Sequence, residues 1–243
     1  MGGDTMKRPL SPEAEAEGDD APVVRRQRQI GARLDTEDVS DYLEGYVASE
    51  ECGVVVFSCF WMATWLIPAY VQARPSDDLS ARVFREGLVG PEKELHVDRV
   101  CERASYREAR LLVIPMIIRE HYVLWVVSRA NRRIEHYDSL SSAVISDREI
   151  SACLVALDWF ATQLGWWAKG SDGLRHTLML PSPPHQTTTV DCGVFVCMYA
   201  YLRIIGGLAP REIEKHPLAQ RVDNFRAYIT GLLTPDDDPP SGI

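Results

Sequence analysis

Hydrophobic positions along this chain of 243 residues form several short runs that are apolar on consecutive positions. Three such runs lie close together, at residues 111–118, 121–128 and 132–137. Continuous apolar runs of this length predict central strands that are covered on both faces. The short turn Ser-Arg-Ala-Asn between the last two runs predicts that they pair as a β-hairpin. Further strands are predicted at residues 53–57 and 174–180.

Two longer segments carry helical patterns. In residues 146–165, Ser146 is placed to cap a helix, Glu149 closes a capping box, and Gly165 marks the end. Residues 194–205 are apolar nearly all round, which predicts a buried central helix that begins near Cys192. Shorter helices are predicted at residues 34–50, 58–66 with an end before Pro68, 77–87, 91–106 and 219–233.

The two ends of the chain differ in composition from the rest. Residues 1–32 are rich in Pro, Glu, Asp and Arg, and residues 234–243 are rich in Pro and Asp, so both are predicted to be disordered tails around one domain at residues 33–233. Two basic clusters, Lys7-Arg8 and Arg25-Arg26-Gln27-Arg28, are separated by an acidic spacer. This layout is typical of a bipartite nuclear import signal, and equally of an ordinary charged tail.

Charge and cysteine content narrow the class of protein. The net charge of −9 argues against a protein that binds nucleic acid through bulk charge. With no apolar stretch of about 18 residues and no apolar N-terminal segment, we expect neither a membrane span nor a secretory signal, and therefore a nuclear or cytoplasmic protein. The six cysteines show no metal-binding spacing, so reduced thiols and no bound metal are expected.

Cys192 stands at the start of the predicted central helix. A thiol in the first helical turn feels the positive end of the helix dipole, which favours the thiolate. Gly193 leaves the backbone beside the sulfur open to a substrate carbonyl group. The alternative is a buried structural cysteine, which is how we interpret Cys197. The nucleophile interpretation therefore needs a base and an oxyanion donor elsewhere in the chain.

His121 and Asp138 are candidates for such a base and its partner. His121 begins one strand of the predicted hairpin and Asp138 closes the other, so the two side chains are expected to be neighbours. An aspartate beside a histidine fixes the ring and stabilises the imidazolium. Gln186, in the loop before Cys192, is a candidate oxyanion donor together with the Cys192 backbone N–H. Taken singly, these residues also fit a sheet-edge histidine, a turn-forming aspartate and a solvated loop glutamine.

The joint pattern resembles one known family. The segments are His121-Tyr-Val-Leu-Trp-Val-Val, Tyr137-Asp138-Ser139-Leu140, and Gln186 followed by Asp191-Cys192-Gly193-Val194-Phe195-Val196-Cys197. Their order and spacing resemble the Ulp/SENP-type SUMO proteases, over about residues 54–230. Tyr122 stands where that family usually has a tryptophan that roofs a narrow Gly-Gly tunnel. The nearest match to the family's Trp-Leu-Asn-Asp-type motif is Tyr42-Leu43-Glu44.

The resemblance implies a papain-like or adenoviral-protease-like α+β fold, with a central mixed sheet flanked by helices and the nucleophile at the start of a buried helix. It implies a cysteine protease without a cofactor that processes SUMO or another ubiquitin-like protein, or removes it from conjugates, after a Gly-Gly end. The implied catalytic residues are His121, Asp138, Gln186 and Cys192, and the implied substrate-contacting residues are Tyr122, Asp191 and Gly193. Three alternatives stay open: a YopJ-like acyltransferase, a polyprotein-processing enzyme, and a catalytically silent module that binds ubiquitin-like proteins.

Overall fold

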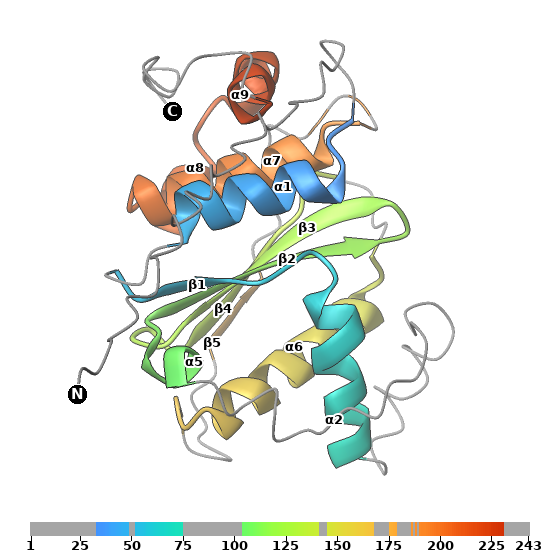
Figure 1. Cartoon of the computed structure of the whole chain (residues 1–243), viewed down its shortest axis with the longest axis vertical. Coiled ribbons are helices and arrows are strands. Elements are labelled where there is room, and N and C mark those ends of the chain that lie inside the picture. The colour runs from blue at the N-terminus through green and yellow to red at the C-terminus, as the bar shows by residue number, and fades with distance from the viewer. Residues whose placement is uncertain are drawn as a thin grey trace, which may run out of the picture.

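The computed structural model describes residues 33–48, 52–74, 104–140, 145–167, 175–178, 186, 188 and 190–230. A single sheet forms the middle layer, with one group of helices on each of its faces (Figure 1). The expected α+β arrangement of a mixed sheet flanked by helices is therefore confirmed. Both predicted tails and the helix predicted at residues 77–87 lie outside the described residues.

The sheet has five strands that lie side by side in chain order. They are β1 (Val54–Val56), β2 (Leu111–Ile118), β3 (His121–Ser128), β4 (Arg133–Tyr137) and β5 (Arg175–Leu178). β2, β3 and β4 pair antiparallel, and the edge strands β1 and β5 pair parallel with β2 and β4. All five predicted strands and the predicted hairpin of β3 with β4 are confirmed.

A second hairpin, between β2 and β3, was not predicted. Its turn consists of Arg119 and Glu120, with φ angles of 49° and 66°, between the paired residues Ile118 and His121. Turns of this kind need positive φ at both positions and usually contain Asn-Gly or Gly-Gly. The sequence Arg-Glu carries no such signal. In the structure both side chains form ion pairs with other elements, Arg119 with Glu149 and Glu120 with Arg33.

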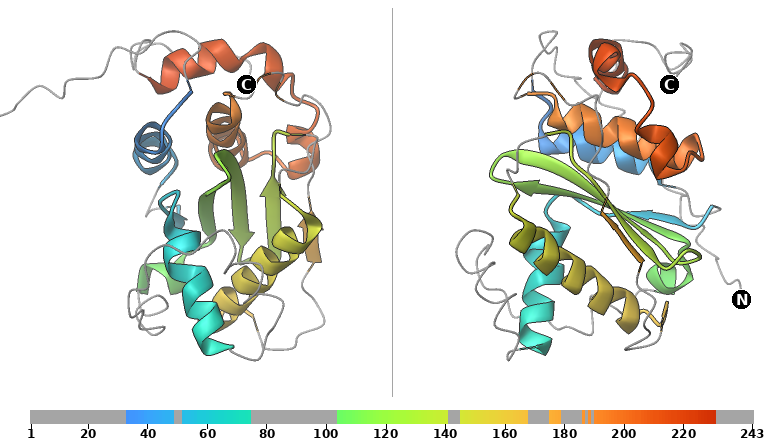
Figure 2. Two further views of the ribbon diagram at one scale, coloured as in Figure 1. Left: turned by 90° about the vertical axis from the view of Figure 1, so that its right-hand side faces the viewer. Right: turned by 180° about the vertical axis from the view of Figure 1, so that it is seen from behind.

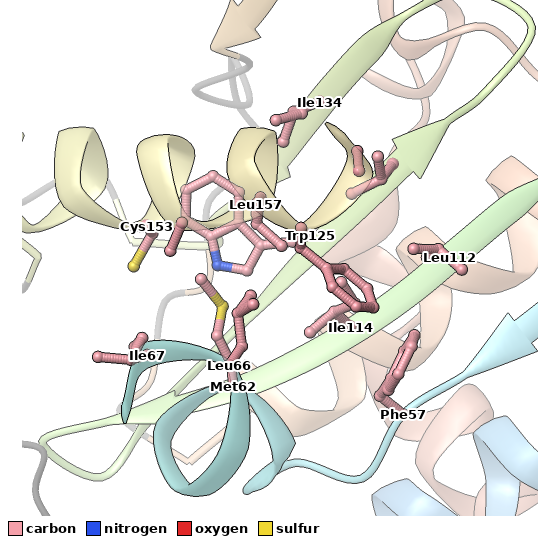
Figure 3. Close-up of a cluster of buried hydrophobic side chains, with 14 of the residues drawn as sticks. Phe57, Met62, Leu66, Ile67, Leu112, Ile114, Trp125, Ile134, Cys153 and Leu157 are labelled. Atoms are coloured by element: carbon pink, nitrogen blue, oxygen red, sulfur yellow. The ribbon is translucent and has the colours of Figure 1, made fainter. Parts of the chain in front are cut away.

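Alternate residues of the central strands serve two separate cores. From β3, Val123, Trp125 and Val127 face one core, while Tyr122, Leu124 and Val126 face the other. Figure 3 shows the first core, where Trp125 lies among side chains of the sheet, Met62 and Leu66 on one helix, and Leu157 on another. Burial of both faces explains why these strands read as continuous apolar runs.

The first core is covered by α6 (Asp147–Gln163) and by a helix made of η2 (Met62–Leu66) and α2 (Ile67–Ala73). The predicted capping box of Ser146 and Glu149 is present at the start of α6. The prediction that the preceding helix breaks before Pro68 is wrong. η2 is a π-helical turn, in which the Ile67 N–H donates to the Met62 carbonyl oxygen, and the helix continues directly into α2, which contains Pro68.

The second core lies under the other helical layer. There α1 (Thr36–Tyr42) and α7 (Cys192–Ala200) run side by side on the sheet, with α9 (Val222–Ile229) beyond α7 (Figure 2). The predicted central helix is confirmed, since α7 continues through η3 (Tyr201–Ile205) to Gly206. The remaining short elements are η1 (Leu43–Val47), α5 (Ala104–Glu108), α8 (Pro210–Ile213) and η4 (Leu218–Gln220).

Three helix predictions differ from the structure in their bounds. α1 and η1 together end at Val47, within the predicted residues 34–50. The last helix was predicted at residues 219–233, but the single-turn η4 and α9 are separated at Arg221, and residues 231–233 lie outside the described residues. Of the helix predicted at residues 91–106, only the part within α5 is described. In the described part of the chain, no helix combines the length and apolarity needed to span a membrane.

Candidate active site

The site forms where the start of α7 meets the end of the sheet that carries His121. Cys192 is the first residue of α7, so its sulfur lies at the positive end of a nine-residue helix. The side chain is buried, with 1% of its surface exposed. Its surroundings, rather than contact with solvent, therefore determine its protonation state.

His121 and Asp138 meet across the β3–β4 hairpin. The ladder ends at the pair Leu124 and Tyr137, so Asp138 follows directly after the last paired residue of β4. Its Oδ1 lies 2.6 Å from Nε2 of His121 and also accepts a hydrogen bond from the Leu140 backbone N–H at 2.8 Å. Because Nε2 is bound to the carboxylate, the other ring nitrogen, Nδ1, is the one left for the thiol.

The sulfur of Cys192 is stabilised as a thiolate. Burial raises its pKa, but hydrogen bonds from His121 and from the Tyr122 backbone N–H, together with the nearby positive charges of His121 and Arg33, bring the pKa below its ordinary value of 9.0. Burial acts in the opposite direction on His121, yet the hydrogen bonds and charges of Asp138 and Cys192 raise its pKa to about 9. The two directions agree, since each shift favours an imidazolium–thiolate pair.

Gln186 is held beside the hairpin by the residue that follows Asp138. Oγ of Ser139 donates a hydrogen bond of 2.7 Å to Oε1 of Gln186, and the Gln186 backbone N–H donates one of 3.0 Å to the Ser139 carbonyl oxygen. Nε2 of Gln186 is buried without a hydrogen-bond partner in the described part of the chain. A buried donor without an acceptor is costly, and a developing oxyanion would satisfy it.

The segment before α1 forms one wall of the site. A Cβ atom on Gly193 would lie 3.2 Å from Cγ2 of Val39 and 3.3 Å from Cβ of Leu34, and 3.7 Å from the Tyr122 ring. The guanidinium of Arg33 lies 6.0 Å from the centre of that ring and forms an exposed ion pair with Glu120 at 3.4 Å. Arg33 therefore lies near Tyr122, while Leu34 and Val39 lie against Gly193.

Asp191 has a different environment from the other predicted substrate-contacting residues. Its carboxylate accepts hydrogen bonds from Arg226 on α9 and from the Thr188 hydroxyl. The ion pair with Arg226 is buried. These contacts tie the residue before Cys192 to the last helix.

Ser139, Arg33 and Arg226 were not found from the sequence. Ser139 is adjacent to a predicted site residue in the Tyr-Asp-Ser-Leu motif, so its position was a usable signal. Arg33 and Arg226 lie far from the motifs along the chain and carried no local signal. In the described residues, no group of three or more His, Cys, Asp or Glu side chains is placed to hold a metal ion.

A thiol paired with an imidazole, a carboxylate behind the imidazole and an amide donor nearby form the constellation of a cysteine-dependent acyl-transfer enzyme. Comparison with protein families identifies the class more closely. Residues 92–230, more than half of the chain, match the C-terminal catalytic domain of the Ulp1 protease family. The chain therefore belongs to the Ulp1 protease family and is a cysteine protease.

Solved structures share the fold. The Ulp1 protease domain in complex with Smt3, the yeast ortholog of SUMO, is 17% identical, with a TM-score of 0.55, over 86% of this chain and 77% of that one. The SUMO protease Ulp1 with its catalytic cysteine oxidised to a sulfenic acid is 17% identical, with a TM-score of 0.53, over 82% and 76% of the two chains. The same protease with a sulfinic acid is 16% identical, with a TM-score of 0.51, over 86% and 80%. These matches confirm the papain-like cysteine protease fold. No curated protein sequence matches this chain.

Proposed function

We propose that this protein is a thiol peptidase or isopeptidase that cleaves SUMO or a related ubiquitin-like modifier after its Gly-Gly end. Cys192 is the nucleophile, His121 the base and acid, and Asp138 the residue that orients His121. Gln186 and the Cys192 backbone N–H bind the oxyanion. The observation that carries the proposal is the contact of His121 with both Asp138 and Cys192.

The reaction proceeds in two halves. The Cys192 thiolate attacks the carbonyl carbon of the last glycine, and negative charge develops on the carbonyl oxygen, where Gln186 and the backbone N–H stabilise it. The C–N bond then breaks as the His121 imidazolium donates its proton to the leaving amine, which leaves a thioester on Cys192. In the second half His121 takes a proton from water, the resulting hydroxide attacks the thioester, and the modifier leaves with a free carboxylate.

Close packing on one side of the nucleophile supports glycine as the residue at the cleaved bond. A Cβ atom on Gly193, beside Cys192, would lie 3.2 Å from Val39, 3.3 Å from Leu34 and 3.7 Å from the Tyr122 ring. A substrate residue without a side chain suits a site with so little free space at this wall. The relative solved with Smt3 bound supports SUMO as the first modifier to test.

A panel of modifier probes tests the proposal. SUMO, ubiquitin and other glycine-ended modifiers, each with a C-terminal electrophile, are incubated with the pure protein and the adducts are mapped by mass spectrometry. We expect an adduct at Cys192 with at least one probe, none with Cys192→Ala, and an unchanged adduct with Cys52→Ala, which removes an exposed cysteine as the control. Cleavage of a modifier fusion that persists in folded Cys192→Ala protein would overturn the proposal.

The alternatives predict other outcomes with these probes and in three further assays. A YopJ-like acyltransferase leaves the modifier probes unreacted but becomes acetylated on Cys192 by acetyl-CoA. A polyprotein-processing enzyme cleaves unfolded glycine-containing peptides as fast as folded modifiers. A silent binding module retains a modifier on a column but forms no adduct.

We further propose that the protein acts in the nucleus. The two basic clusters Lys7-Arg8 and Arg25-Arg26-Gln27-Arg28 support import. A fluorescent fusion of the full chain is expected to accumulate in nuclei, and replacement of both clusters by alanine is expected to release it to the cytoplasm. Equal distributions of the two fusions would contradict a working import signal.

A further inference from the structure

We propose that Ser139 is a positioning residue that directs the Gln186 amide N–H toward the oxyanion. The inference rests on the proposed function and assigns a role to a residue next to Asp138. It concerns the orientation of a donor, not the binding of the substrate.

The contacts between the two residues run in both directions. The Ser139 hydroxyl donates to Oε1 of Gln186, and the Ser139 carbonyl oxygen accepts from the Gln186 backbone N–H. The two side chains are 1% and 8% exposed, so water does not readily replace these bonds. Gln186 is thereby fixed at both its backbone and its side chain to a residue 47 positions earlier in the chain.

The direction of the side-chain bond matters for the chemistry. A glutamine amide can present either its oxygen or its NH₂ group to a given point. With Oε1 held by the Ser139 hydroxyl, the group left over is Nε2, which is buried and has no acceptor among the described residues. The opposite orientation would turn a carbonyl oxygen toward a thiolate and a developing oxyanion, which repel it.

One short loop therefore serves two parts of the site. Asp138 accepts a hydrogen bond from the Leu140 N–H and orients His121, while Ser139 between them orients Gln186. The base His121 and the oxyanion donor Gln186 are thus both held by the loop of residues 138–140. A loss of the Ser139 hydroxyl should affect the donor and spare the base.

Four proteins test this in a double-mutant cycle: wild type, Ser139→Ala, Gln186→Ala and the double variant. The substrate is the glycine-ended modifier fusion that the wild type cleaves. Gln186→Ala is expected to lower kcat about 100- to 1000-fold, as loss of one oxyanion donor does. Ser139→Ala is expected to lower kcat roughly 10- to 100-fold with little change in KM, because the donor acts in the transition state. The double variant is expected to be no slower than Gln186→Ala.

Two controls separate positioning from a purely structural role. Ser139→Thr keeps the hydroxyl and is expected to restore most of kcat. The thiolate absorbance of Cys192 is expected to titrate as in the wild type in Ser139→Ala, because His121 and Asp138 are untouched. A loss of the thiolate in that variant would show that the loop had collapsed and would overturn the assignment.

The outcomes also separate this inference from the proposed function. If Gln186→Ala is slow but Ser139→Ala has wild-type kcat, or if the two effects multiply in the double variant, Ser139 does not act through Gln186. If Gln186→Ala itself cleaves at the wild-type rate, Gln186 does not stabilise the oxyanion. The positioning role of Ser139 is then overturned as well. A wild-type protein that cleaves no modifier overturns both.

Discussion

At the scale of single residues, the pKa of each buried cysteine depends on whether it has a charged partner. Four buried cysteines illustrate this point: Cys59, Cys153, Cys192 and Cys197. Burial raises the pKa of Cys59 to about 11, and the pKa values of Cys153 and Cys197 also lie above the ordinary value. Only in Cys192, of these four, do His121 and a backbone N–H outweigh burial. The surroundings of the same residue type therefore favour the neutral thiol at three positions and the thiolate at one.

Asp138→Asn tests the partner of His121. Without the carboxylate, burial dominates and the pKa of His121 falls from about 9, so the imidazolium is lost at lower pH. The alkaline limb of kcat/KM should therefore move to lower pH, and kcat should fall by roughly two to four orders of magnitude. Steady-state cleavage over a range of pH measures both effects. An alkaline limb at the wild-type position would contradict the role of Asp138.

His136→Phe tests a second buried histidine. His136 is fully buried, stacks on Trp125 with ring centres 4.2 Å apart, and has no hydrogen-bond partner on either ring nitrogen in the described part of the chain. Burial lowers its pKa to about 4. Between about pH 6.5 and 4 the unfolded chain therefore binds a proton that the native state does not, and stability falls as the pH falls.

The phenylalanine variant should lose less stability over that pH interval, by up to roughly 3 kcal/mol relative to the wild type. Urea unfolding of both proteins at neutral and mildly acidic pH measures the difference. Identical losses in the two proteins would show that folding does not lower the pKa of His136.

At the scale of elements, the β2–β3 turn determines the orientation of His121. Arg119 and Glu120 both adopt positive φ directly before His121, and each is held by an ion pair to a different helical layer. Arg119 binds the buried Glu149 at the start of α6, and Glu120 binds Arg33 before α1. A strained turn persists when its surroundings hold it in place. The strand that begins at His121 is thus anchored mainly by the contact of Arg119 with the buried Glu149, since the pair of Glu120 with Arg33 is exposed.

Arg119→Ala should loosen this turn. Glu149 loses a partner while keeping its capping contacts with Ser146, so the expected loss of stability is small, about 1 kcal/mol. The rate of cleavage should fall several-fold because the orientation of His121 is less well fixed. Arg148→Ala, which removes an exposed arginine beside Glu149, is the matched control and should match the wild type in both denaturant unfolding and cleavage. Equal activity of the two variants would show that the turn needs no anchor.

The sequence predicted most elements of the fold, for identifiable reasons. The strands were found because burial on both faces makes them apolar throughout, and α6 because its capping box is local. The pairing of His121 with Asp138 followed from hairpin geometry alone. The pairing of β2 with β3 was not predicted because the Arg-Glu turn lacks the usual hairpin residues, and the continuous helix through Pro68 was missed because a π-helical turn precedes the proline. Arg33 and Arg226 could not be found, since their partners lie far away along the chain.

At the scale of the whole molecule, the residues that we propose to be catalytic come from two layers that must keep their relative position. His121 begins β3 and Asp138 directly follows β4, whereas Cys192 begins α7. Figure 1 shows α7 in the helical layer on one face of the sheet. The buried pair of Asp191 and Arg226 joins the start of α7 to α9, the last helix of the described chain. α9 therefore helps to hold Cys192 against the sheet.

Arg226→Ala should be strongly destabilising, by about 3 kcal/mol or more, because it leaves the Asp191 carboxylate buried without its partner. The double variant Asp191→Asn, Arg226→Met removes both charges and should recover most of that loss. Arg211→Ala, on the exposed side of α8, serves as the control. Thermal and denaturant unfolding give the comparison, and a double variant no more stable than Arg226→Ala would argue against the pair.

The central claim is that His121 and Cys192 form an imidazolium–thiolate pair, and the pH titration of the Cys192 thiolate tests it most directly. The ultraviolet thiolate absorbance of the wild type minus that of Cys192→Ser isolates this one sulfur. We expect a pKa below the ordinary value of 9.0 in the wild type, and a clear increase in His121→Ala. A thiol that titrates at or above 9.0, and that is unaffected by loss of His121, would contradict the account.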